Sequence, residues 1–209
     1  MKTGLVAAAD ALWMSLETCD EAAASGVLDG LVGWYGADVV AAELVPLVLR
    51  VFERRLERRQ ISQAQHDFAR GFLEAGLFRL ARGWAEGEGP RALLASAPGA
   101  ARELRLVAFG LALRRRGWRI SYLGCEVSFD AMIDAARLLG PRLAVVALAD
   151  GMAPEDRGSA ELRALAACAP LALLGGAHRL ASSVGARTLG RDLIAEARHL
   201  TASAVAPIG

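Results

Sequence analysis

The sequence has no long uncharged apolar run and no surplus of either charge, and each absence excludes a class of protein. No stretch reaches the roughly 18 uncharged apolar residues that a membrane-spanning helix needs, and Asp10 interrupts an N-terminal segment that otherwise resembles a signal peptide. The 24 basic and 23 acidic residues give a net charge of +1, so composition offers no electrostatic reason to bind nucleic acid or an anionic membrane. We therefore expect a cytoplasmic protein.

Cysteine and histidine are also scarce, which argues against a disulfide framework and against a metal centre. The three cysteines are scattered along the chain at Cys19, Cys125 and Cys168. The three histidines are His66, His178 and His199. Neither set has metal-ligand spacing, and an odd number of separated cysteines suits a reducing compartment. Cys19 and Cys168 fall inside expected helices, where we expect them to be core residues. No Ser–His–Asp or Cys–His arrangement and no phosphate-binding loop is recognisable, so we expect no enzyme.

What the chain does contain begins with helical periodicity. Residues 1–86 repeat apolar positions at intervals of three and four, which predicts four helices with short connections, a four-helix bundle. Thr18 or Asp20 is expected to cap the second helix, and Ser62 the fourth. Pro46 should kink the third helix or be tolerated near its first turns. The arginine-rich run at the end of that helix is expected to be a solvated face with internal ion pairs.

After a Gly- and Glu-rich linker at 83–91, the pattern changes to short apolar runs that alternate with helical stretches. The expected strands are 92–97, 119–124, 143–149, 171–176 and, at an edge, 186–190. Continuous apolar strands alternating with helices predict an α/β unit over residues 91–209 with a buried, doubly wound parallel sheet. Ligands of such folds bind beyond the carboxyl ends of the strands. The segments expected there are 97–105, 124–128, 149–152 and 175–179.

Three sequence motifs in this second part carry a family resemblance. They are LRRRGWRISYLG at 113–124, the Pro98–Gly99 pair, and the late Gly175–Gly176 pair. Following a helical bundle, they resemble the cobalamin-binding half of CarH-type photoreceptors, which are light-dependent repressors of the MerR family. The resemblance runs from about residue 5 to residue 200. It implies a cobalamin-binding-type Rossmann domain, a sensory role and self-association. The DNA-binding segment that precedes this unit in many members is missing here, so no direct nucleic-acid binding is expected.

The sequence departs from the family at the motif that supplies the lower axial ligand of cobalamin. The family motif D/E-x-H-x-x-G matches residues 100–105, which read AARELR. Arg102 stands where a histidine ligates cobalt, and a protonated guanidinium has no lone pair for a metal. Arg105 stands where a glycine admits the nucleotide tail. A bland alternative is that Arg102 only caps a helix or pairs with Glu103.

The upper side of the family's site has changed as well. Its tryptophan–histidine pair falls on Leu56 and Glu57, and its glutamate–histidine pair falls on His66 and Asp67. The upper histidine ligand is therefore absent. As a lone histidine, His66 is open to a structural or a ligand-contacting role.

Two interpretations follow from these replacements, loss of the ligand or repurposing of the pocket, and we favour repurposing for a linear bilin such as biliverdin. Haem and bilins carry two propionates, and Arg102 and Arg105 can pair with carboxylates bidentately. The resemblance places such a ligand between the bundle and the strand ends. Haem, cobalamin without histidine ligation and a ligand-free regulatory scaffold stay open, as does a regulatory protein partner.

Four further residues are candidates for ligand contact. Cys125 is either an inert buried thiol or, if solvent reaches it, a site for a thioether to a bilin vinyl group. The pair Gly175–Gly176 forms a tight turn that permits close backbone approach to a ligand. His178 follows that turn and is ambiguous between a structural and a binding role.

Overall fold

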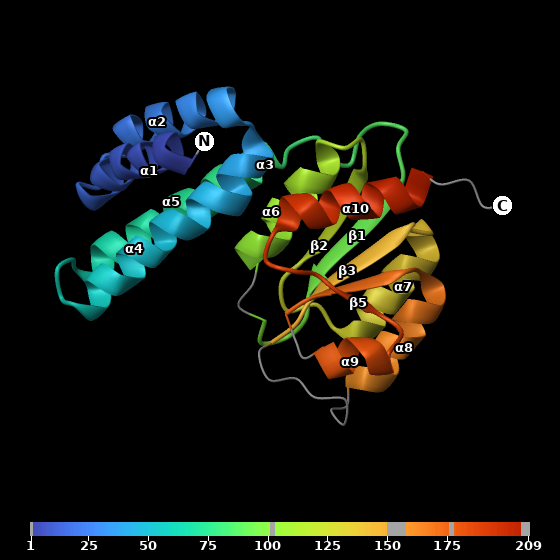
Figure 1. Ribbon diagram of the computed structural model, residues 1–209. Helices are drawn as coiled ribbons and strands as arrows, with labels where there is room; N and C mark the ends of the chain where they lie inside the picture. Colours follow the sequence, from blue (N-terminus) through green and yellow to red (C-terminus); the bar gives the residue numbers. More distant parts are fainter. Residues whose placement is uncertain (1, 101–102, 150–157, 176–177, 206–209) are drawn as a thin grey trace. The chain divides into compact units, whose positions relative to one another are not determined.

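The computed structural model describes residues 2–100, 103–149, 158–175 and 178–205. They form two compact units, Met1–Arg82 and Gly83–Gly209, whose elements are labelled in Figure 1. The expected linker belongs to the second unit, where Arg119 holds it through two hydrogen bonds. Arg119 donates from its backbone N–H to the Pro90 carbonyl at 2.9 Å and from Nε to the Gly89 carbonyl at 2.8 Å.

The first unit is helical throughout. Its elements are α1 (Lys2–Glu17), α2 (Glu21–Tyr35), α3 (Ala37–Val39), a π-helical segment (Val40–Leu44), α4 (Val45–Glu57) and α5 (Gln63–Leu80). Asp20 caps α2 by accepting from the Ala23 N–H at 2.9 Å. Ser62 caps α5 in a reciprocal capping box with Gln65. Both caps were predicted, Asp20 as one of two alternatives. Cys19 was predicted wrongly: it is exposed in the turn after α1, with a φ of 53° that ends the helix.

Pro46 explains the π-helical segment. Proline has no N–H, so the helix cannot form the usual bond from this position back to the carbonyl four residues earlier. The turn before Pro46 is widened instead, and the Val45 N–H donates to the carbonyl of Val40, five residues back. Pro46 then occupies the first turn of α4, where it is tolerated.

The second unit is built on a five-stranded parallel sheet of order β2-β1-β3-β4-β5. The strands are β1 (Arg91–Ser96), β2 (Arg119–Gly124), β3 (Leu143–Ala147), β4 (Leu171–Leu174) and β5 (Arg187–Thr188). The helices are α6 (Glu103–Arg114), α7 (Phe129–Leu139), α8 (Gly158–Cys168), α9 (His178–Ser183) and α10 (Leu193–Val205). The predicted fold class, a helical part followed by a doubly wound parallel sheet, is confirmed.

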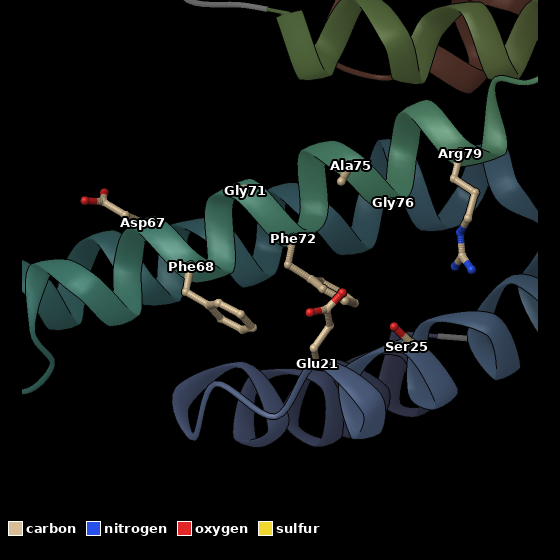
Figure 2. Close-up of a pocket in the computed structure, with 9 residues that line it drawn as sticks. All are labelled: Glu21, Ser25, Asp67, Phe68, Gly71, Phe72, Ala75, Gly76 and Arg79. Atoms are coloured by element: carbon tan, nitrogen blue, oxygen red, sulfur yellow. The ribbon is translucent and has the colours of Figure 1, made fainter.

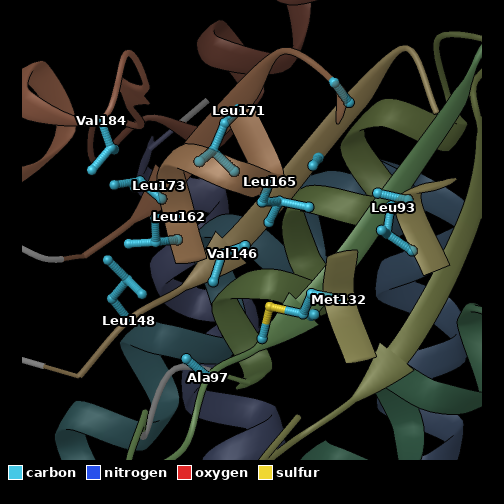
Figure 3. Close-up of a cluster of buried hydrophobic side chains, with 14 of the residues drawn as sticks. Leu93, Ala97, Met132, Val146, Leu148, Leu162, Leu165, Leu171, Leu173 and Val184 are labelled. Carbon is cyan, nitrogen blue, oxygen red and sulfur yellow. The ribbon is translucent and has the colours of Figure 1, made fainter. Parts of the chain in front are cut away.

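Both faces of the sheet are covered, which is why its strands read as continuous apolar runs. Helices α6 and α10 pack on one face, and α7 and α8 pack on the other (Figure 1). Figure 3 shows the cluster on the second face, where Leu93 and Val146 of the sheet meet Met132 of α7 and Leu162 of α8. On the first face, Trp118 is buried, and its Nε1 donates to Thr201 of α10 at 2.9 Å.

A search of the described helices for membrane spans finds no single one that is both long and apolar enough to cross a bilayer. Taken together, Glu21–Tyr35 and Ala37–Glu57 meet the length and composition criteria, but this pair is bent by 117°.

Candidate functional site

The strand order of the second unit identifies a candidate ligand site. The chain winds outward from β1 in one direction to β2 and in the other direction to β3, β4 and β5, so the order reverses between β1 and β3. In open parallel sheets, ligands bind in the crevice at this reversal, outside the carboxyl ends of the strands. The loops after β1 and β3 therefore border the site. Of these loops, residues 101–102 and 150–157 lie outside the described residues.

The end of β1 and the loop after it are joined to the segment that follows β2 by two hydrogen bonds. The Gly99 N–H donates to Glu126 Oε1 at 2.9 Å, and the Val127 N–H donates to the Ser96 carbonyl at 2.9 Å. Gly99 has a φ of 74°, a conformation that favours glycine, and Glu126 has a φ of 53°. Sequence reasoning missed Glu126, because no local pattern marks a carboxylate that bonds to a backbone N–H 27 residues away.

Of the two arginines in the segment 100–105, the structure describes only Arg105. Arg102 lies outside the described residues. Arg105 is half-buried in the first turn of α6, and its Nη2 donates to the Gly190 carbonyl at 3.3 Å. Gly190 is fixed in turn by Glu196, whose Oε1 accepts from the Gly190 N–H at 3.1 Å. Arg105 therefore joins α6 to the loop before α10, a structural role that was not predicted.

The other predicted positions at this edge follow β2 and β4. Cys125 is exposed directly after β2, with its Sγ 3.8 Å from the Tyr122 hydroxyl. Of the two alternatives for this residue, the buried thiol is therefore wrong, and the thiol is reached by solvent. Gly175 follows β4 with a φ of 89°, which agrees with the expected tight turn. Gly176 lies outside the described residues, and His178 is exposed as the first residue of α9.

The predicted bundle residues lie at the end of α4 and the start of α5 within the first unit. Leu56 is half-buried and Glu57 is exposed at the last residue of α4. His66 Nδ1 lies 3.2 Å from Asp67 Oδ1, and that oxygen also accepts from Gln63 Nε2 at 2.8 Å. The hydrogen bond from His66, followed by that from Gln63, lowers the pKa of Asp67 below its usual value.

A tryptophan is present next to this region, although it comes from a different helix. The Arg55 guanidinium stacks over the ring of Trp13 of α1, 4.4 Å from the ring centroid. Arg55 pairs with Glu17 of α1 at 3.1 Å rather than with a neighbour in its own run, so the expectation of ion pairs internal to that run is wrong for this arginine. Sequence reasoning missed this stack, because Trp13 and Arg55 belong to different helices.

The family resemblance aligns Glu57 with the upper cobalt ligand and Arg102 with the lower one, and a guanidinium has no lone pair with which to bind a metal. Within the described residues, no group of three or more His, Cys, Asp or Glu side chains could hold a metal ion.

The fold is shared with a solved corrinoid protein. The monomethylamine corrinoid protein of Methanosarcina barkeri matches with a TM-score of 0.69 over 92% of this chain and 96% of its own, at 14% identity. The likeness shows that the chain has the fold of a corrinoid protein, with a cobalamin-binding-type Rossmann domain. The methanol:cobalamin methyltransferase complex of the same organism gives a TM-score of 0.48 over 96% of this chain and 80% of its own, at 11% identity, which is too low to add to this conclusion.

Sequence similarity identifies one relative that is named as a transcriptional repressor. The HTH-type transcriptional repressor CarA of Myxococcus xanthus is 36% identical over 88 residues, which cover 42% of this chain and 31% of the repressor. The chain therefore matches about a third of the length of this curated relative. No protein-family model matches the chain.

Proposed function

We propose that this chain is a regulatory module whose sheet unit binds a tetrapyrrole beyond the carboxyl ends of its strands. The observation that carries the proposal is the fold shared with a corrinoid protein. To this we add our assignment of Arg102, which stands where the family resemblance places the lower cobalt ligand. The similarity to the CarA repressor supports a regulatory rather than a catalytic role. The ligand would act by favouring one arrangement of the protein over another.

A linear bilin such as biliverdin is the ligand that we propose, and this choice rests on residue chemistry. A bilin needs no metal ligand from the protein, so the replacements at Glu57 and Arg102 do not prevent its binding. It brings two propionates, and a guanidinium binds a carboxylate bidentately. We assign that contact to Arg102, since Arg105 already donates to Gly190. Gly99 and the turn at Gly175 would allow close approach of the backbone to the pigment.

Cobalamin bound without a histidine ligand is the second candidate, and the match to a corrinoid protein favours it. The side chains of a corrin are neutral amides, and the anionic group of cobalamin is the single phosphodiester of its nucleotide tail, whereas a bilin brings two propionates. A guanidinium pairs bidentately with either kind of oxyanion. The two candidates are therefore distinguished by the absorption spectrum of the bound pigment.

Absorption spectroscopy tests the proposal. Purified protein is titrated separately with biliverdin, haem and adenosylcobalamin, and each complex is passed through a desalting column. We expect a retained broad red band with biliverdin that weakens several-fold in Arg102→Ala, since charge-assisted hydrogen bonds contribute about 1.5–3 kcal/mol each. Arg137→Ala is the control, because Arg137 is an exposed arginine on α7. Retention of none of the three pigments would reject the proposal, and a histidine-coordinated cobalamin spectrum would reject the motif assignment.

We further propose that light is the signal and that a change in self-association or partner binding is the response. If the bound pigment absorbs light and shifts the protein between arrangements, the assembly state or the affinity for a regulatory partner changes with illumination. Size-exclusion chromatography with light scattering, in the dark and after red illumination, measures the assembly directly. Equal masses in all four samples, with and without pigment, would remove oligomer switching from the proposal.

A further inference from the structure

The first unit contains a groove that the proposed function does not use. It has a volume of about 460 Å³ and runs between α2 and α5 (Figure 2). This size is within the usual range for small-molecule sites. The α5 side is lined by three small residues, Gly71, Ala75 and Gly76, which have little or no side chain and leave space between the two helices. All residues that line the groove belong to the first unit.

Two phenyl rings form the apolar wall of the groove. Phe68 and Phe72 stack with ring centroids 6.4 Å apart and an interplanar angle of 24°. Both side chains are directed from α5 toward α2 (Figure 2), and both residues are only half-buried. Aromatic rings bind flat apolar groups by stacking, and their faces attract cations. This wall therefore suits a ligand that has an aromatic body and a positive charge.

The charge around the rings favours a cation. The Glu21 side chain extends from α2 toward α5 and lines the groove together with Phe72 (Figure 2), and within the described part of the chain no hydrogen bond or ion pair involves its carboxylate. Asp67 adds a second carboxylate, whose pKa is lowered by its hydrogen bond from His66, so it is ionised at neutral pH. The arginine of the groove, Arg79, is paired with Asp29 at 2.6 Å and leaves the negative charge of Glu21 uncompensated.

We propose that this groove binds an amphipathic organic cation, a primary ammonium or guanidinium group on an aromatic body. The aromatic body lies against Phe68 and Phe72, and the cationic group lies beside Glu21. This arrangement combines apolar contact, attraction of the cation to a ring and pairing with a carboxylate that has no other partner. The residues of this site belong to the helical unit. Of them only Asp67 was also a predicted pigment contact, and the proposed function assigns no pigment contact to it.

Three probes with the same aromatic body and different charge test the proposal. They are 1-naphthylmethylamine, which is an ammonium ion at neutral pH, the neutral 1-naphthylmethanol, and the anionic 1-naphthoate. Binding to the full chain is followed by the amide chemical shifts of Gly71, Phe72 and Ser25 in titrations up to about 10 mM, which reaches weak millimolar binding. We expect saturable shifts with the ammonium probe, and binding about two- to five-fold weaker with the alcohol.

Substitutions with matched controls separate the groove from the rest of the surface. Glu21→Gln should weaken the ammonium probe about two- to five-fold and leave the alcohol unchanged, whereas Glu53→Gln, at an exposed position of α4, should change neither. Gly71→Leu should abolish binding by filling the groove. A Cβ at Gly71 meets no atom within 4 Å, so this variant should fold. Gly30→Leu has an equally open Cβ on α2, outside the groove, and should bind normally.

Each result decides the proposal. Preference for the ammonium probe that is lost in Glu21→Gln and in Gly71→Leu supports it. The absence of saturable shifts at these amides overturns it. Equal affinity for the ammonium and the alcohol would show a merely apolar groove and overturn the assignment of a cation. Binding that survives in Gly71→Leu would place the probe elsewhere and overturn the site. Loss of biliverdin binding would leave all four of these outcomes unaffected.

Discussion

Replacing Arg105 by alanine should lower stability without changing pigment affinity. In the structure Arg105 Nη2 donates to the Gly190 carbonyl at 3.3 Å. Hydrogen bonds from charged groups contribute about 1.5–3 kcal/mol, but this contact is long and the side chain is only half-buried. We therefore expect the loss to be about 1 kcal/mol. Arginine and alanine have similar helix propensities, so α6 itself should not weaken. For a chain of this size the change corresponds to a melting temperature lower by about 2–4 °C.

The assay for this prediction pairs calorimetry with pigment titration. Glu196 still holds the Gly190 N–H in the variant, so the loop before α10 should stay in place and biliverdin affinity should change by less than about two-fold. Arg137→Ala is the control for loss of an exposed arginine and should stay within about 0.5 kcal/mol of the parent. If Arg105→Ala melts like the parent and loses pigment affinity several-fold, its guanidinium serves the ligand. That result would refute the structural role of Arg105 as a hydrogen-bond donor to Gly190.

Three further predictions concern packing, capping and pH. A Cβ at Gly89 would collide with the carbonyl of Gly117, so Gly89→Ala should cost about 1–3 kcal/mol in calorimetry, and an unchanged melting temperature would contradict the close approach. Ser62→Ala removes the capping box of α5 and should lower the urea-unfolding free energy by about 0.5–2 kcal/mol; a change in slope alone would not count as support. His66→Ala should raise the pKa of Asp67 toward its ordinary value in a ¹³C-carboxyl titration. The stabilisation by ionised Asp67 is present above its unfolded pKa and is lost as pH falls through the lowered folded pKa, so the variant should lose it at a higher pH; identical titration curves would argue against the hydrogen bond.

Local signals in the sequence were sufficient for most of the fold. Ser62 followed three residues later by Gln65 predicts a helix start, and the structure forms the capping box. The strand at 119–124 was predicted with its observed limits, because Gly117 precedes it and Gly124 ends it with a φ of 105°. The prediction was wrong at Cys19, since an exposed residue of positive φ after a helix gives no signal in an alanine-rich segment.

The contacts that define the candidate site were not predictable from the sequence, because they join distant residues. Arg105 and Gly190 are 85 positions apart, and Gly99 and Glu126 are 27 apart. In both pairs a side chain bonds to a backbone group, and a backbone group leaves no mark in residue identity. Topology supplies these pairs, since parallel strands bring the loops after them to one edge of the sheet. The sequence did predict that these segments lie at the ligand-binding edge of the sheet. The predicted segments contain Gly99, Arg105 and Glu126 but not Gly190.

The buried cluster on the α7–α8 face has a consequence for how such a protein can diversify. Its strand residues, such as Leu93 and Val146, lie within the paired part of the sheet, whereas ligand choice is assigned to the loops beyond the strands (Figure 3). Two members of the cluster, Ala97 and Leu148, are the first residues of those loops. Substitutions beyond these two positions leave the packing of the cluster untouched, and distant changes add nearly independently in stability. Selection can therefore exchange one ligand for another without first repairing the scaffold. A library confined to the loops after β1 and β3 that keeps Ala97 and Leu148 should yield folded variants in high proportion, which makes this sheet a practical starting point for new ligand-binding proteins.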